Sequence, residues 1–232
     1  MEERQQSRRI QTSILNGLER RALEWMARRL PRWVSSDLMT AIGMIGAVII
    51  AVGYALSGRN VNWLWLASFG FLVNWFGDSL DGTIARVRHL QRPIYGFFLD
   101  HNVDCVNETV MFVGAGLSPF LHLPIAMGAL VAYLLLSVYV YIYAHLKNEF
   151  KLTYAGFGPT ELRVIVVIVN TLLIYVTPLR EFTREFVISG EAVTFHLLDF
   201  VALAITLILL IFYGVSLVRG AREFGRMDPP KA

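Results

Sequence analysis

Two carboxylate-bearing segments organise this sequence: Asp78-Ser-Leu-Asp81-Gly-Thr-Ile-Ala-Arg86 and, after nine residues, Gly96-Phe-Phe-Leu-Asp100-His-Asn-Val-Asp104. Asp78 and Asp81 are spaced i,i+3, and Asp100 and Asp104 are spaced i,i+4, so each pair lies on one face if its segment is helical. Two such helices facing each other would bring four carboxylates together. Unpartnered carboxylates in or near a bilayer are costly. The pattern therefore predicts a site for one or two divalent metal ions.

Composition predicts an all-α membrane protein. Apolar residues make up 55% of the chain and charged residues 17%, against roughly 25% charged in an ordinary soluble domain. The apolar residues form long runs near the ~20 residues that a bilayer requires. We expect six transmembrane helices near 38–57, 62–87, 95–117, 122–146, 161–178 and 193–218. The net charge of +3 is modest and unevenly placed, which suits a membrane topology better than nucleic-acid binding.

The N-terminal segment predicts an amphipathic helix ahead of these spans. From Ile10 to Leu30, apolar residues recur at near-helical spacing among Arg and Glu. This pattern is typical of an interfacial helix on an anionic leaflet, and a soluble partner-binding helix is the alternative. The domains expected are a cytoplasmic tail with the interfacial helix (1–34), a six-helix catalytic domain (35–220) and a cytoplasmic tail (221–232).

The distribution of Lys and Arg predicts the orientation. The N-terminal segment holds eight Arg, and the loops after the second and fourth spans and the C-terminal tail are also basic. By the positive-inside rule both termini and these two loops are cytoplasmic. The Asp pairs would then lie at the cytoplasmic end of the second span and the cytoplasmic start of the third, so the site would open to the cytosol.

The complete pattern is Asp-x-x-Asp-Gly-x-x-Ala-Arg, nine residues, then Gly-x-x-x-Asp-x-x-x-Asp. It resembles the signature of the CDP-alcohol phosphotransferase family, which comprises membrane enzymes of phospholipid synthesis. Chance would match eight fixed residues on the order of once in 10¹⁰ start positions. One further family feature, Pro-Asn-x-x-Thr at the start of the first span, is matched only by Thr40, because Ser36 and Asp37 stand at the first two positions. The signature residues are Asp78, Asp81, Gly82, Ala85, Arg86, Gly96, Asp100 and Asp104.

The residue types fit phosphoryl transfer. Carboxylate oxygens are the ligands that Mg²⁺ or Mn²⁺ prefers, and paired metals can clamp a pyrophosphate. Gly82 and Gly96 remove side chains where a nucleotide could approach, and Arg86 offers a planar fork for a phosphate. A carboxylate next to the metals can accept the proton of an attacking hydroxyl.

The resemblance implies specific roles. Asp78, Asp81, Asp100 and Asp104 would hold the metal ions, two Mg²⁺ or Mn²⁺, and Asp104 would also be the general base. The cytidine diphosphate (CDP) part of the donor would contact Asp81 and, in addition, Gly82, Ala85, Arg86, Gly96 and Thr40. The acceptor alcohol would attack the β-phosphate and release CMP. The resemblance also implies a homodimer.

Four other residues are open to two interpretations. Lys151 and Arg163 could bind an anionic acceptor, or could be ordinary positive-inside anchors. His101 is reminiscent of the choline and ethanolamine branch of the family, or is a packed or solvated histidine. Glu108, one turn after Asp104, could orient a ligand or pair with a neighbour.

Several functions remain to be distinguished. The enzyme could transfer phosphatidate from CDP-diacylglycerol to a soluble alcohol, which we favour, or a head group from CDP-choline or CDP-ethanolamine to diacylglycerol. Intramembrane prenyltransferases are disfavoured because their Asp-rich motifs lie far apart in sequence. A divalent-cation transporter would need polar residues through the bilayer centre, and the fourth and sixth spans offer almost none. A structural ion-pair network with Arg86 and Arg88 would leave carboxylates unneutralised.

Overall fold

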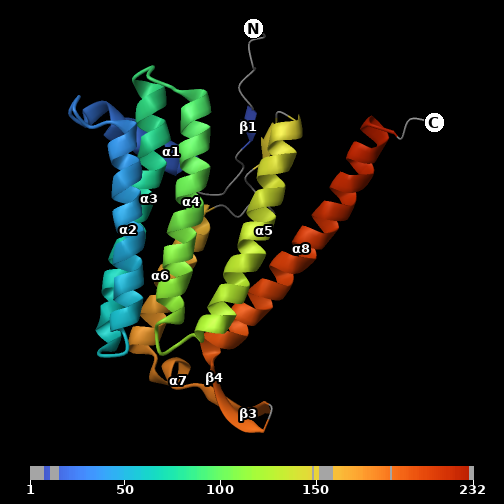
Figure 1. Cartoon of the computed structure of the whole chain (residues 1–232). Helices are drawn as coiled ribbons and strands as arrows, with labels where there is room; N and C mark the ends of the chain where they lie inside the picture. The colour runs from blue at the N-terminus through green and yellow to red at the C-terminus, as the bar shows by residue number, and fades with distance from the viewer. Residues whose placement is uncertain (1–7, 11–15, 148, 152–158, 189, 230–232) are drawn as a thin grey trace.

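A computed structural model describes residues 8–10, 16–147, 149–151, 159–188 and 190–229, and helices dominate it (Figure 1). The helices are α1 (Asn16–Arg29), α2 (Ser36–Leu56), the 3₁₀ turn η1 (Val61–Trp63), α3 (Leu64–Val87), α4 (Pro93–Gly116), α5 (Leu123–Lys147), α6 (Pro159–Tyr175), α7 (Thr177–Arg180) and α8 (Leu197–Met227). Strand β1 (Arg8–Ile10) pairs in parallel with β2 (Glu149–Lys151), and β3 (Thr183–Ile188) pairs antiparallel with β4 (Glu191–His196).

The long helices fall on the six predicted apolar segments, so the all-α prediction is confirmed. Three of them, α2, α5 and α8, are long and apolar enough to cross a membrane. Two boundaries differ from expectation. The predicted sixth segment starts at residue 193, which lies in β4 of a hairpin, whereas α8 begins at Leu197. The fifth helix ends at Tyr175 because Pro178 lies in the first turn of a new short helix, α7.

Helices α2 and α3 cross at backbone contact. A Cβ placed on Gly77 would overlap the backbone of Gly43, and one on Gly46 would overlap the backbone of Asn74. The Asn74 side chain is 1% exposed, and its Nδ2 donates a 3.0 Å hydrogen bond to the carbonyl of Gly43. Small residues at a helix crossing let the backbones approach this closely. The crossing fixes α3, and with it the carboxylate of Asp78 one turn after Asn74.

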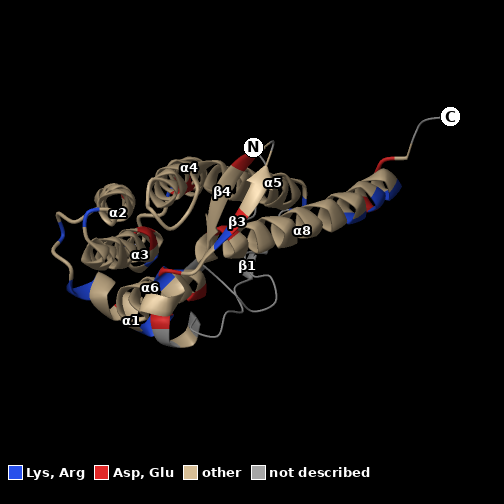
Figure 2. Ribbon diagram, turned by 90° about the horizontal axis from the view of Figure 1, so that it is seen from below, with Lys and Arg blue, Asp and Glu red and all other residues tan. Residues whose placement is uncertain are grey.

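Helix α1 packs on the α2–α3 pair. Its apolar residues Leu23 and Ala27 are buried in a cluster with Leu80 and Ile84 of α3. The basic residues of α1 lie on its exposed side, and in Figure 2 the blue of Lys and Arg colours parts of the ribbon of α1 and the last part of α8. The predicted helix began at Ile10, but residues 11–15 lie outside the described part of the chain, in which the helix starts at Asn16.

A buried carboxylate joins α8 to the rest of the bundle at the end opposite the Asp pairs. Asp199 is 0% exposed. It accepts hydrogen bonds from the backbone N–H and ring Nδ1 of His122, both 2.8 Å, and from the backbone N–H of His196 at 2.7 Å. Beyond this point α8 packs against α5 and diverges from the other helices (Figure 1).

The close crossing makes a testable prediction at Gly53, where an added Cβ would overlap the backbone of Ala67. Gly53→Ala should lower the apparent melting temperature in detergent by about 3–10 °C, because the helices must separate to accept the methyl group. Gly128→Ala is the matched control, since a Cβ there meets nothing within 4 Å. Equal melting temperatures for wild type and Gly53→Ala would contradict the tight crossing.

Candidate active site

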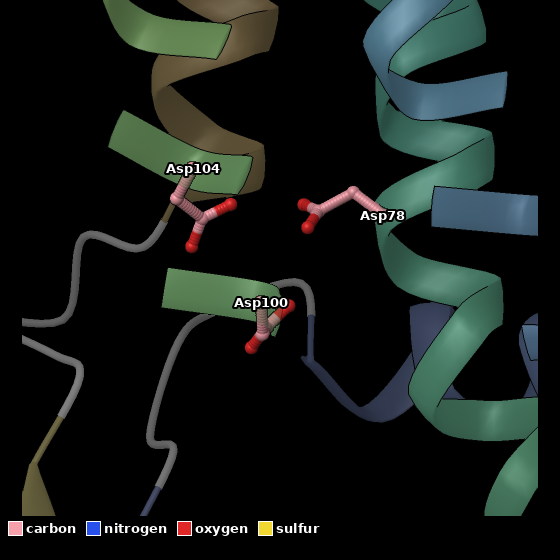
Figure 3. A group of neighbouring side chains, drawn as sticks. All are labelled: Asp78, Asp100 and Asp104. Carbon is pink, nitrogen blue, oxygen red and sulfur yellow. The ribbon is translucent and has the colours of Figure 1, made fainter. Parts of the chain in front are cut away.

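Three of the four motif carboxylates converge. Asp78 comes from α3, and Asp100 and Asp104 come from successive turns of α4 (Figure 3). One oxygen of each carboxylate lies within 4.8 Å of the other two. The predicted meeting of an i,i+3 helix and an i,i+4 helix thus occurs for these three side chains.

The connection from α3 to α4 brings the two motif halves face to face. His89 has φ +56°, a left-handed backbone conformation that ends α3 and turns the chain. Arg88 holds the turn by donating hydrogen bonds to the carbonyls of Leu30 (2.9 Å) and Val34 (2.5 Å). Arg92 binds both oxygens of Asp37, at 2.6 and 2.7 Å, and these bonds raise the pKa of its guanidinium. Because Arg88 donates to backbone carbonyls, it does not fit a structural ion-pair network with the motif carboxylates.

Asp81 faces α2 and lies outside the group of three. Its Oδ2 accepts a 2.9 Å hydrogen bond from the hydroxyl of Thr40, and its Oδ1 accepts one from the backbone N–H of Gly82. Its own carbonyl accepts a 2.9 Å bond from the Ser36 hydroxyl. Residue 36, where the sequence departs from the family pattern, thus still contacts the motif. Asp37, at the other departure, pairs with Arg92.

The space beside the two motif glycines is open. A Cβ on Gly96 would meet nothing within 4 Å, and one on Gly82 would meet only Nη1 of Arg86, at 3.5 Å. Arg86 is exposed, and its Nη2 donates a 2.9 Å hydrogen bond to the Thr83 hydroxyl. Helix packing therefore does not explain these glycines, in contrast to Gly43 and Gly77 at the α2–α3 crossing.

Arg163, a cation from outside the motif, reaches the carboxylates. Arg163 of α6 forms a 2.7 Å ion pair with Oδ2 of Asp78. Arg163 offsets at most one of the three negative charges in the group. Three hard oxygen donors with excess negative charge fit a divalent ion such as Mg²⁺ or Mn²⁺. The side chain of Lys151, the other basic residue considered from the sequence, lies outside the described structure.

Helix α5 contributes aromatic residues that the sequence analysis did not identify. Tyr133 lies near Glu108, whose Oε2 is buried and has no hydrogen-bond partner within the described part of the chain. The His101 ring lies between the rings of Phe97 and Tyr141, with centroid distances of 4.1 and 4.2 Å, and its Nδ1 is 2.7 Å from the Phe97 carbonyl. His101 is thus packed among aromatic rings. Tyr133 and Tyr141 are eight residues apart, on one helical face, which was the available signal.

Three relatives of known kind are similar to this chain. Phosphatidylinositol phosphate synthase of Cutibacterium acnes is 38% identical over 86 residues, 36% of this chain and 38% of the relative. Archaetidylinositol phosphate synthase of Methanothermobacter thermautotrophicus is 27% identical over 169 residues, 72% of this chain and 81% of the relative. Cholinephosphotransferase 1 of Danio rerio is 29% identical over 96 residues, 39% of this chain and 25% of the relative.

The match therefore spans well under half of the first and third relatives, and most of the second. A family model described as CDP-alcohol phosphatidyltransferase matches residues 33–212, which include all the motif residues and helices α2 to α6. This confirms the resemblance carried by the eight motif positions. The chain belongs to the CDP-alcohol phosphatidyltransferase family, a family of enzymes that transfer substituted phosphate groups.

Proposed function

We propose that this protein makes a phosphodiester lipid by transferring the phosphatidyl group of CDP-diacylglycerol to an alcohol. The observation that carries the proposal is the convergence of Asp78, Asp100 and Asp104 beside Arg163. The acceptor oxygen would form a bond to the β-phosphorus of the donor. The pyrophosphate bond would break at the same phosphorus, CMP would leave, and the hydroxyl proton would pass to Asp104.

The carboxylates would hold the metal ions. Asp78, Asp100 and Asp104 are the nearest set, and Asp81, one turn along α3, would be the fourth ligand. Two bound Mg²⁺ or Mn²⁺ ions would stabilise the charge on the pyrophosphate and on the entering and leaving oxygens. The partial burial of the three carboxylates supports a bound cation, because carboxylates withdrawn from water are costly without a positive partner.

The donor would lie over the open side of α3 and α4. The space at Gly82 and Gly96 would admit a nucleotide close to the backbone, and the exposed Arg86 would bind a phosphate of the donor. Ala85 lies on α3 between Gly82 and Arg86. Thr40 would act through its hydrogen bond to Asp81. Asp104, on α4, would accept the proton of the acceptor hydroxyl.

The acceptor is proposed to be a phosphorylated alcohol such as inositol phosphate. Two of the three relatives are named phosphatidylinositol phosphate synthase and archaetidylinositol phosphate synthase, and the second matches 72% of this chain. Arg163, at the edge of the carboxylate group, and Lys151, whose backbone lies in β2 before α6, are the cations proposed to bind the acceptor phosphate. The choline-type alternative rests on the third relative and on His101.

We further propose that six helices cross the membrane, α3, α4 and α6 in addition to the three apolar ones, with α1 on the cytoplasmic surface. Lys and Arg are concentrated in the N-terminal segment, in the connections after α3 and α5 and in the C-terminal tail. This distribution supports cytoplasmic termini and a cytoplasmic site. A homodimer is the proposed assembly, by analogy with the family.

The first test is CMP release by purified protein with Mg²⁺. CDP-diacylglycerol, CDP-choline and CDP-ethanolamine would each be offered inositol, inositol phosphate, glycerol phosphate, serine and diacylglycerol. We expect release from CDP-diacylglycerol with inositol phosphate, lost in EDTA and restored by Mg²⁺ or Mn²⁺. Release only from a CDP-alcohol with diacylglycerol would establish the choline-type activity. Metal flux without CMP release would establish a transporter.

Asp104→Asn should lower kcat at least about a hundredfold, because the amide cannot accept the acceptor's proton. Binding of the CDP-linked donor should change little, and calorimetry would measure it. Asp228→Asn, at the exposed C-terminal end of α8, is the control and should keep wild-type kcat. Retention of more than a few per cent of the wild-type kcat would remove Asp104 from the role of base.

Arg163→Gln should raise KM for inositol phosphate by about tenfold or more, because a charge-assisted hydrogen bond to the acceptor phosphate is lost. The same variant assayed with unphosphorylated inositol should show a much smaller change. Equal effects on both acceptors would place Arg163 in the support of Asp78 rather than in phosphate recognition.

A further inference from the structure

Glu19, on the N-terminal helix, accepts hydrogen bonds from two other helices. Its Oε1 lies 2.7 Å from the indole Nε1 of Trp75, 3.5 Å from the Ser79 hydroxyl and 2.9 Å from the Thr160 hydroxyl. Trp75 and Ser79 lie one turn apart on α3, and Thr160 lies in the first turn of α6. One carboxylate oxygen therefore joins α1, α3 and α6.

These contacts lead directly to the carboxylate group. Thr160 and Arg163 are spaced i,i+3, so they lie on one face of α6. Arg163 pairs with Asp78, and Asp78 is the neighbour of Ser79 in the chain. The contacts close a loop from Glu19 through Thr160 and Arg163 to Asp78 and back through Ser79. Arg163 is thus positioned by its ion pair with Asp78 and by the hydrogen bond of Thr160, one turn earlier on α6, to Glu19.

These side-chain contacts of Glu19 do more than attach α1 to the bundle. The helix is already docked through Leu23 and Ala27, which are buried against α3. By contrast, α6 has Glu19 as the acceptor for a hydroxyl in its first turn, close to Arg163. A charged acceptor makes these hydrogen bonds stronger than neutral ones. Loss of Glu19 should therefore release the start of α6 more than it releases α1.

We propose that Glu19 is a positioning residue, which holds Arg163 beside Asp78 through Thr160 and so sets the affinity for the acceptor. The inference rests on the proposed function, in which Arg163 binds the acceptor phosphate. Glu19 does not touch the reacting groups. Its loss should weaken acceptor binding while leaving donor binding, which is proposed to use the turns at Gly82 and Gly96, nearly unchanged.

The test compares five variants in full-length protein. Glu19→Ala removes the acceptor oxygen, and Glu19→Gln keeps an oxygen but loses its charge. Glu24→Gln is the matched control, since Glu24 is on the same helix and pairs with the exposed Arg20 at 2.9 Å. Thr160→Val removes the hydroxyl at constant shape, and Thr160→Ser restores it. Measured for each are KM for acceptor and donor, kcat, melting temperature, and the Kd of inositol phosphate with Mg²⁺.

We expect Glu19→Ala and Thr160→Val to raise acceptor KM and Kd by about tenfold, with donor KM within about twofold. Glu19→Gln should lie between, and Glu24→Gln and Thr160→Ser should match wild type. Unchanged acceptor Kd in Glu19→Ala would overturn the inference, as would equal losses in both KM values with a lowered melting temperature.

The two proposals fail separately. If wild type binds inositol phosphate but releases no CMP from any donor, the proposed function fails, and the Kd comparison still tests Glu19. If wild type does not bind inositol phosphate at all, the inference is overturned whichever donor is used.

Discussion

Mutual repulsion among Asp78, Asp100 and Asp104 is the constraint on which the rest of the structure depends. Three carboxylate oxygens within 4.8 Å of one another repel strongly where polarity is low, and Arg163 supplies one positive charge at most. Such a group is stable only if the surrounding helices hold it rigidly and a cation can enter. The same negative charge would make the site a binding place for the metal ions that phosphoryl transfer uses.

The rigidity comes from two different kinds of contact. Helices α2 and α3 touch at backbone distance through glycines, so packing fixes the backbone that carries Asp78, and Arg163 binds its carboxylate at 2.7 Å. Helix α4 is held by the turn at His89 and by Arg88, which binds carbonyls between α1 and α2. The polar contacts of Arg88 and Asn74 engage backbone carbonyls rather than the carboxylate group.

Asp81 illustrates how a motif residue can differ from its neighbours. It shares a helical face with Asp78, yet its oxygens accept hydrogen bonds from Thr40 and from the N–H of Gly82. This link connects α2, which begins with Ser36, to the motif. The i,i+3 spacing could predict the shared face, but not which side chain would find a donor on the neighbouring helix.

The sequence by itself determined the helical class, the approximate positions of the long helices, the family and the meeting of the two Asp segments. These follow from local rules: apolar length, helical periodicity and a motif of eight residues. Only the tertiary structure decided that Glu19 meets Thr160, that Arg163 pairs with Asp78, that His122 and His196 share Asp199, and that a hairpin precedes α8. The pairs Glu19–Thr160, Arg163–Asp78 and His122–Asp199 are distant in sequence, and no periodicity links them. They depend on how whole helices pack.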